Sequence, residues 1–435
     1  MANTSLSKVF GTSTDEKKWT LSVWIKHSGT SGQEHIMFSN AGGNNNTGWF
    51  QIQISGNKLN LNGYSTTWLT STQYLRDVSG WYHLVITADS TAAAANRLKA
   101  YINGQEITSW STNNIGGSTS SNQTWGINMS GTNYIGAEGS GGANGFNGSM
   151  SYLNFIDGTV YLPSAFGETD TTTGEWVGKT SPSVTYGNNG FFIFKDSNGI
   201  TDQSGKGNNW TVANGTLTIL KDSPDNTFAT FNPLDVNKGT VTTFSNGNTT
   251  VMHNAGANPS TTASRSTLAY SSGKFYWEAK CIATGGAVRT GIISMSSSDY
   301  NTQTNPFSLN ECYNYVQNGQ KGSSGDTNVS YGATYTAGDI IGIAHDADNG
   351  TLAFYKNGVS QGNAFTGLST SLFWGAFSSE YNQGKYSYNF GNGNFGTTAI
   401  TTNSGNGYSG AEGSSKFNYT VPSGYSALNT KGLNE

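Results

Sequence analysis

Aromatic side chains in polar segments are the residues of this sequence best suited to binding chemistry, because sugar rings stack on tryptophan and tyrosine faces. Aromatic residues make up 12% of the chain, with 11 Trp and 22 Tyr. The candidate ligand contacts among them are Trp49, Tyr64, Trp68, Trp110, Trp125, Tyr300, Tyr313, Tyr315 and Trp374. Each could instead be an ordinary core residue, but as a set they keep glycan recognition open, since loops on rigid sheets commonly carry function.

Motifs for nucleophilic, zinc or phosphate chemistry do not occur in the sequence. There is no Gly-x-Ser-x-Gly elbow, no His-Glu-x-x-His and no phosphate-binding loop. The histidines are His27, His35, His83, His253 and His345, and they show no metal-ligand spacing. His83 lies within a strand motif and is interpreted as structural. We therefore expect a protein that is not an enzyme.

Length, charge and cysteine content exclude further classes. The 435 residues carry a net charge of -4 and only 22 basic residues, so no nucleic-acid partner is predicted. No long apolar run predicts a membrane span, and the first residues lack the shape of a signal peptide. Cys281 and Cys312 cannot build a disulfide framework. The low charge also predicts recognition through neutral contacts that weaken little with added salt.

The hydrophobic period is two residues almost throughout, which predicts an all-β fold. Alternating segments run over 19–26, 81–87 and 98–102 in the first half, and over 275–281, 340–345, 352–356 and 386–390 in the second. Asn103-Gly104 and Asn357-Gly358 are hairpin-turn dipeptides. We predict two antiparallel β-sandwich (jelly-roll) domains in tandem, residues 1–221 and 222–435, with 166–221 as a closing or connecting segment of the first.

The first half resembles the laminin-G-like and pentraxin-like branch of concanavalin A-like jelly rolls. Four motifs occur in the order typical of that family: the strand 19–26, Gly80-Trp81-Tyr82-His83, the strand 98–102 with its Asn-Gly hairpin, and Phe146-Asn147-Gly148. Residues 191–210 resemble the Asp-x-Ser-Gly edge segment of the same family. The resemblance implies a sandwich whose rim binds ligands.

The second half resembles a SPRY domain. The signature residues are Phe275-Tyr276-Trp277-Glu278, Gly338-Asp339-Ile340-Ile341-Gly342 and Phe354-Tyr355-Lys356-Asn357-Gly358. In SPRY domains one face built from loops binds a partner. The resemblance therefore implies partner contacts at residues 300–315 and around Trp374.

The concanavalin A-like resemblance raises two chemical options. Some members hydrolyse glycosides with paired carboxylates spaced Glu-x-Asp-x-x-Glu on one strand, and the nearest match is Glu168-x-Asp170 with Glu175 two positions late. We interpret that stretch as a solvated loop. Many members also bind calcium at the rim, which makes Asp196, Asn198 and Asp202 the candidate calcium ligands. A second acidic stretch, 346–350, is interpreted as a hairpin turn.

The pair of domains, with the junction 222–234, resembles structural proteins of tailed phages. The resemblance implies a non-enzymatic protein on the virion surface, assembled in the host cytoplasm: a tail-fibre or spike module that binds a host-surface glycan or protein. Its partners would be other virion proteins and further copies of itself, with a trimer favoured. Two alternatives stay open, a capsid decoration or head-fibre protein and a carbohydrate-active enzyme.

Overall fold

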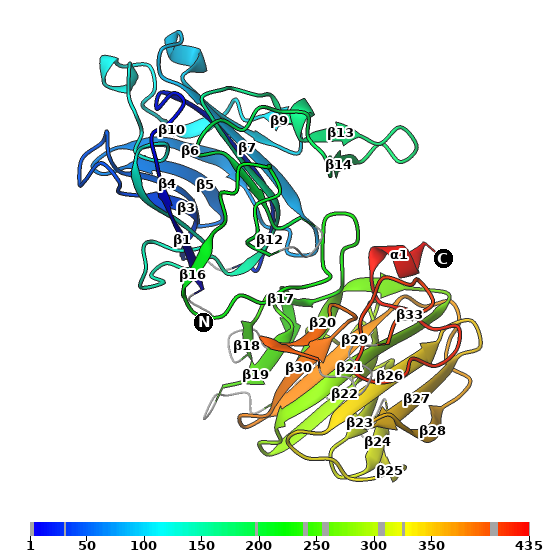
Figure 1. Ribbon diagram of the computed structural model, residues 1–435. Coiled ribbons are helices and arrows are strands. Elements are labelled where there is room, and N and C mark those ends of the chain that lie inside the picture. The colour runs from blue at the N-terminus through cyan, green and yellow to red at the C-terminus, as the bar shows by residue number, and fades with distance from the viewer. Residues whose placement is uncertain are drawn as a thin grey trace. The chain divides into compact units, whose positions relative to one another are not determined.

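The computed structural model describes residues 4–29, 32–195, 199–237, 242–254, 261–302, 309–323, 327–400 and 408–434 (Figure 1). The chain divides into two compact units, Met1–Ile219 and Leu220–Glu435, so the division lies two residues before the one predicted from the sequence. Both units are built from antiparallel β-sheets, which confirms the predicted all-β class. Within the described residues no helix is long and apolar enough to cross a membrane.

Unit 1 packs two sheets face to face, here called sheets A and B. Sheet A has, in spatial order, β10 (Trp110–Asn113), β6 (Thr67–Tyr74), β5 (Lys58–Gly63), β4 (Phe50–Ser55), β3 (Gln33–Ser39), β11 (Gly131–Ile135), β1 (Ser5–Phe10) and β16 (Thr211–Asn214). Sheet B has β15 (Phe191–Ile193), β12 (Gly148–Asp157), β2 (Lys18–His27), β7 (Tyr82–Asp89), β8 (Leu98–Ile102) and β9 (Gln105–Glu106).

The core of unit 1 lies between the inner faces of these sheets. Alternate residues of β2, from Trp19 to Ile25, point into it, as their period of two predicts. Trp210, which comes just before β16, is also buried there, so the segment after residue 166 completes the core. Part of that segment forms the hairpin β13 (Gly167–Thr169) and β14 (Trp176–Gly178). Short 3-10 turns lie at Ala94–Asn96, Ser118–Ser120 and Pro163–Ala165.

Unit 2 also packs two sheets around one main core, here called sheets C and D. Sheet C has β17 (Phe231–Asn237), β20 (Thr261–Tyr270), β29 (Trp374–Tyr381), β22 (Ala287–Ser294), β23 (Cys312–Val316), β24 (Gln320–Ser323) and β25 (Thr327–Ser330). Sheet D has β18 (Thr242–Ser245), β19 (Thr250–His253), β30 (Lys385–Asn389), β21 (Lys274–Ala283), β26 (Ile340–Asp346), β27 (Thr351–Lys356) and β28 (Val359–Phe365). Smaller elements are β31 (Asn394–Phe395), β32 (Thr398–Ala399), β33 (Ser426–Ala427) and the helix α1 (Thr430–Leu433).

The two predicted Asn-Gly hairpins form as expected. Asn103 and Gly104 have φ values of 48° and 80°, and Asn357 and Gly358 have 49° and 80°. Positive φ at both central residues of a two-residue turn matches the right-handed twist of the strands that it joins. The side chain of each asparagine also stabilises its turn, since Asn103 Oδ1 accepts a hydrogen bond from the His83 N–H and Asn357 Oδ1 accepts one from the Ile340 N–H.

Within the segment 408–434, the residues around Phe417 pack on the outer face of sheet D and are anchored there by Glu278, whereas β33 pairs with β21 in the sheet itself. The Glu278 carboxylate is fully buried and accepts the backbone N–H groups of Asn418 at 2.9 Å and Tyr419 at 2.8 Å. Asn389 Nδ2 donates to it as well. Burial raises the pKa of Glu278 to about 7, although these donors act in the opposite direction. Phe417 packs beside this anchor, against Tyr276.

A second carboxyl group is buried inside the core of unit 2. Glu380 of β29 has an exposed fraction of 0%, and Ser378 Oγ donates a hydrogen bond to its Oε1. Tyr388 donates in turn to Ser378 Oγ at 2.7 Å. Among the described residues, no group donates a hydrogen bond to Glu380 Oε2. Burial raises the pKa of Glu380 to about 8, so this carboxyl carries a proton at neutral pH.

Candidate functional site

Four aromatic rings form a row on the outer face of sheet A. Tyr64 directly follows β5, Trp49 directly precedes β4, Phe38 lies in β3 and Tyr134 in β11, and these four strands are neighbours in sheet A. The ring centroids of Tyr64 and Trp49 are 6.0 Å apart, those of Trp49 and Phe38 5.4 Å, and those of Phe38 and Tyr134 6.1 Å. Tyr64 is 52% exposed, and Trp49 and Tyr134 are half-buried. This aromatic row joins two of the predicted candidates, Trp49 and Tyr64.

Two pairs of amide side chains lie beside the aromatic row on the same face. Gln51 is paired in register with Asn62, and Gln53 with Asn60, between β4 and β5. Their alternating neighbours Ile52 and Leu61 enter the core, so the amides must face outward. Gln53 Oε1 and Asn62 Oδ1 accept no hydrogen bond from the described residues. Both of these oxygens are buried, and Gln51 and Gln53 are only 6% and 3% exposed. The polar surface beside the aromatic row is therefore that of the half-buried Asn60 and Asn62.

The structure does not support ligand contact for the other tryptophan candidates of unit 1. Trp68 and Trp125 are 1% and 0% exposed, and their rings pack against each other in the core with centroids 6.4 Å apart. They cannot meet a ligand in the folded protein. Trp110, on the edge strand β10, is half-buried and packs against the same core. Trp68 is carried inward by β6, whereas Trp125 lies in a turn with a φ of 46° and is buried all the same.

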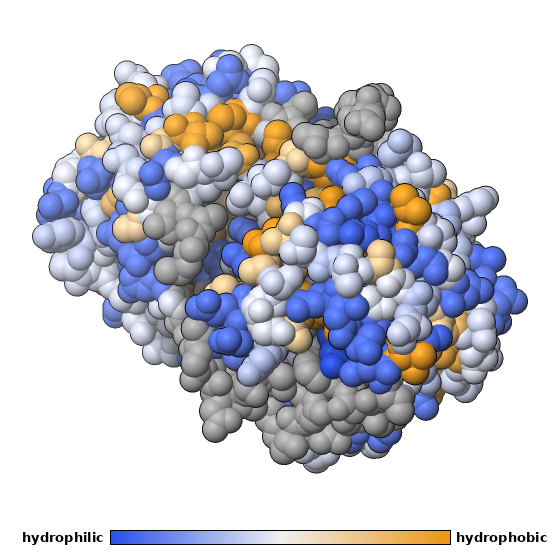
Figure 2. Space-filling model, turned by 90° about the horizontal axis from the view of Figure 1, so that it is seen from below, coloured by the Kyte–Doolittle hydropathy of each residue, from blue (hydrophilic) through white to orange (hydrophobic). Residues whose placement is uncertain are grey.

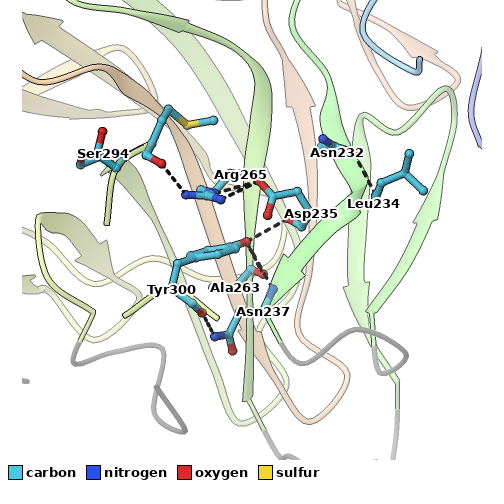
Figure 3. A network of polar contacts seen from close by, with 10 residues as sticks. Asn232, Leu234, Asp235, Asn237, Ala263, Arg265, Ser294 and Tyr300 are labelled. Atoms are coloured by element: carbon cyan, nitrogen blue, oxygen red, sulfur yellow. Dashed lines mark hydrogen bonds and ion pairs between the residues drawn. The ribbon is translucent and has the colours of Figure 1, made fainter. Parts of the chain in front are cut away.

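Tyr300 is likewise a structural residue and not a ligand contact (Figure 3). It is 1% exposed, and its hydroxyl lies 3.1 Å from Asp235 O and 3.0 Å from Ala263 O, both acceptors. The Arg265 guanidinium covers its ring at 3.8 Å and forms an ion pair with Asp235 at 2.7 Å. Arg265 also donates to the carbonyl of Met295. This network holds the loop after β22 on the outer face of sheet C.

Tyr315 and Trp374 are both 0% exposed and belong to the core of unit 2, so these two predicted contacts are corrected as well. Tyr313 is half-buried, with its ring 5.1 Å from Phe365 and 5.8 Å from Trp374. Close to it, Lys321 Nζ lies 5.0 Å from the Phe365 ring and 5.9 Å from that of Tyr331. We call Tyr313, Lys321, Tyr331 and Phe365 the unit 2 surface. Only Tyr313 among them was a candidate from the sequence.

His83 is structural, as predicted. Its side chain is fully buried and its ring stacks on that of Trp24, with centroids 4.8 Å apart. Trp176 Nε1 donates to His83 Nδ1, so the ring proton sits on Nε2 and points to Ser22 Oγ at 2.8 Å. Burial lowers the pKa of His83 to about 3, which keeps the imidazole neutral.

The carboxylates of 168–175 lie on the exposed hairpin formed by β13 and β14. Asp170 accepts the N–H groups of Thr172 and Thr173, which organise the turn and lower its pKa. Glu168 forms an ion pair with Lys179 at 3.4 Å. The predicted interpretation as a solvated loop is therefore correct.

Two of the three predicted calcium ligands, Asp196 and Asn198, lie outside the described residues. The third, Asp202, uses its carboxylate to organise the chain around it. Asp202 Oδ1 accepts hydrogen bonds from the N–H groups of Phe192 and Ser204. Its Oδ2 accepts hydrogen bonds from the Ser204 hydroxyl and the Asn208 N–H, and all four distances are 2.8 Å. These contacts take up about four acceptor positions of the carboxylate, and calcium binding at this segment stays a prediction from the sequence. Among the described residues no group of three or more His, Cys, Asp or Glu could hold a metal ion.

We expect Asp202→Asn to destabilise unit 1 whether or not calcium is present. The amide keeps one accepting oxygen and replaces the other by a donor, which leaves at least one N–H group unpaired, at about 1–3 kcal/mol. Thermal unfolding in calcium chloride and in EDTA measures this. A calcium-dependent gain in melting temperature that the variant lacks would contradict the expectation.

Fold and surfaces together define a protein built from two β-sandwich binding modules. Residues 3–161 match the family model described as the concanavalin A-like lectin/glucanases superfamily, and residues 274–393 match that of the SPRY domain. The chain thus carries both domains that its motifs predicted. The acidic stretch 346–350 is the turn between β26 and β27, as predicted.

The relatives matched by sequence share only part of this chain. Ran-binding protein 9 of Danio rerio is 34% identical over 104 residues, which cover 23% of this chain and 17% of that protein. The Ran-binding proteins 9/10 homolog of Drosophila melanogaster is 33% identical, over 24% of this chain and 11% of that protein. The chain therefore spans less than a fifth of the length of these relatives.

Among solved structures, the SPRY domain of human HERC1 is similar at 18% identity, covering 36% of this chain and 96% of that one with a TM-score of 0.31. Stonustoxin is similar at 17% identity, covering 37% of this chain and 27% of that one with a TM-score of 0.28.

Proposed function

We propose that the protein is a non-enzymatic binding protein that recognises glycans through the aromatic row of sheet A and the half-buried Asn60 and Asn62 beside it. The observation that carries the proposal is the row itself, in which Tyr64 and Trp49 leave ring surface exposed beside amide groups. Rings supply stacking surface and amides supply directional hydrogen bonds, which is the combination that a polyhydroxylated ring needs. Figure 2 shows a largely polar surface on the face drawn, with hydrophobic residues in scattered patches.

We further propose that unit 2 binds a protein partner through the unit 2 surface. The presence of a SPRY domain supports a role in protein interaction. The half-exposed rings around Lys321 support this location, since aromatic residues are enriched in protein interfaces. The Ran-binding relatives bind Ran according to their names, but the shared stretch is too short to carry that partner over to this chain.

The finer proposal is a virion surface protein of a tailed phage, acting as a tail-fibre or spike module in several copies. Its support is the pairing of these two domains, the junction 222–234 and the weakly charged, glycine-rich composition. A head-fibre or capsid decoration protein remains the second form of the same proposal. Imaging of purified particles with an antibody to this chain would distinguish tail from head, and absence from particles would refute both.

The glycan proposal predicts that Trp49→Ala with Tyr64→Ala weakens binding at least tenfold, which corresponds to about 1.4 kcal/mol. Binding is measured on an array of bacterial surface polysaccharides, with Phe373→Ala as the control because Phe373 is equally exposed but lies in unit 2. Equal binding by a folded double variant and the intact protein would refute the proposal. Release of reducing ends from any bound polysaccharide, lost in Glu168→Gln, would show that the protein is an enzyme.

A further inference from the structure

Two cations lie on one exposed aromatic ring at the far end of β5 from the aromatic row. Lys58 Nζ lies 4.6 Å from the centre of the Tyr74 ring and Arg76 Cζ lies 4.2 Å from it. Tyr74 is 46% exposed and Arg76 is exposed. We call Lys58, Tyr74 and Arg76 the cation cluster. The two charges are therefore no more than about 9 Å apart, close to one Debye length of about 8 Å at physiological salt.

Neither cation of the cluster is neutralised by a carboxylate. Lys58 and Arg76 take part in no ion pair among the described residues. The adjacent Asp77 directs its Oδ1 to the N–H and hydroxyl of Ser79. Two like charges held together without a counter-charge repel each other, and an anion between them removes that repulsion. The chain has only 22 basic residues among 435, so two of them on one ring are unusual for this sequence.

The backbone beneath the cation cluster is fixed from both strands. Lys58 and Tyr74 are register partners between β5 and β6. The turn before Lys58 is held by Asn57, whose carbonyl accepts the Leu75 N–H at 2.7 Å and whose Oδ1 lies 3.1 Å from His27 Nε2. His27 is itself buried. The backbone that carries Lys58 and Tyr74 is thus held by hydrogen bonds, so ligand binding does not have to order it.

The cation cluster and the aromatic row lie on one continuous face. Lys58, Asn60 and Asn62 alternate with Leu59 and Leu61, which are in the core, so the three polar residues share the outer face of β5. Tyr64 follows directly after this strand. At about 3.3 Å per residue, the face runs about 20 Å from the cations to the first ring.

From this arrangement we propose that the glycan bound by sheet A is acidic: its neutral rings lie on the aromatic row and its sulfate, phosphate or carboxylate groups are held by Lys58 and Arg76. The inference rests on the proposed function and names the class of its ligand. The low charge of the sequence predicts binding that weakens little with added salt. The inference predicts the opposite for this ligand, because salt screens the charges of the cation cluster. The site is an extended track, so a polymer should bind better than free anions.

The experiment compares dextran with dextran sulfate, which share a backbone and differ in charge, by affinity electrophoresis of the full chain. We expect tighter binding of dextran sulfate, falling as sodium chloride is raised, and little competition from free sulfate. Lys58→Gln with Arg76→Gln should weaken dextran sulfate binding at least tenfold. The control, Lys206→Gln with Lys221→Gln, removes the same charge from exposed positions elsewhere and should bind like the intact protein.

The outcomes separate this inference from the proposed function. If the cation variant binds dextran sulfate like its control while Trp49→Ala with Tyr64→Ala loses binding, the acidic-ligand inference is overturned and the glycan proposal stands. If the cation variant loses binding while the aromatic variant keeps it, the anion site stands and the aromatic row is not used. Failure of the intact protein to bind dextran sulfate, or equal competition by free sulfate, overturns the inference.

Discussion

Replacing Glu278 by leucine is expected to lower the free energy of unfolding of unit 2 by about 2–4 kcal/mol and to release the segment 408–434 from sheet D. The variant leaves the N–H groups of Asn418 and Tyr419 and the amide of Asn389 without their acceptor. Each unpaired donor in a part-buried position costs free energy, and Phe417 loses the anchor next to it. Thermal unfolding and limited proteolysis measure the two effects.

Glu278→Gln is the graded comparison for this prediction. Its single amide oxygen can still accept one of the two backbone N–H groups, so its loss of stability should lie between those of the intact protein and the leucine variant. Glu175→Leu, at an exposed position, should leave both stability and proteolysis unchanged. Unchanged protection of 408–434 in Glu278→Leu would show that the segment is held by other contacts.

The stability of unit 2 should fall as pH rises from about 4.5 to 8, and Glu380→Gln should remove a large part of that fall. The folded-state pKa of Glu380 is raised to about 8, whereas an ordinary glutamate side chain has a pKa of 4.5. Over this interval the unfolded chain releases a proton that the folded chain keeps, so ionisation favours unfolding by about 1.4 kcal/mol per pH unit. Glu278, with a pKa of about 7, also lowers the stability of unit 2 as pH rises towards 7.

Buried histidines act in the opposite direction and must be separated from this effect. Burial lowers the pKa of His345 to about 4. The stability that the neutral His345 contributes is therefore fully present above about pH 6.5 and is lost as pH falls towards 4. Denaturant unfolding of the full chain between pH 6.5 and 8 therefore isolates the glutamates. Glu380→Gln should be more stable than the intact protein at pH 8, since its amide still accepts from Ser378. An equal pH slope in both proteins would refute the assignment, and Glu175→Gln serves as control.

The fold followed closely from local patterns. Period-two alternation placed β2, β7, β21 and β26 correctly, and Asn-Gly dipeptides located two hairpins, because these signals depend only on neighbouring residues. The order of strands in each sheet did not follow, since β1 pairs with both β11 and β16 across long stretches of chain. Pairings of that kind depend on which sheet face each strand can bury.

The candidate site was only partly predictable for the same reason. Trp49 and Tyr64 were recognised by residue type, but Phe38 and Tyr134 join them only because β3 and β11 happen to be neighbours in sheet A. The alternation of Gln51 and Gln53 with Ile52 was a legible sign of a polar outer face. Conversely, Trp68 and Trp125 looked like loop residues although both rings are core, because flanking polar residues do not report where a ring points.

The first and last segments of unit 2 contact each other in the folded protein, so this unit cannot complete its fold until its last residues are present. Phe228 bridges to Asn429, and the Thr227 N–H donates to Thr430 Oγ1 across 203 positions of the chain. Contacts of such high sequence separation raise the contact order and slow folding. During synthesis, the first strands of the unit must wait beside the ribosome until residues 426–430 have emerged. Nascent unit 2 therefore exposes the apolar surface around Phe228 and Tyr276 until its last residues emerge, and such a surface favours aggregation during that time.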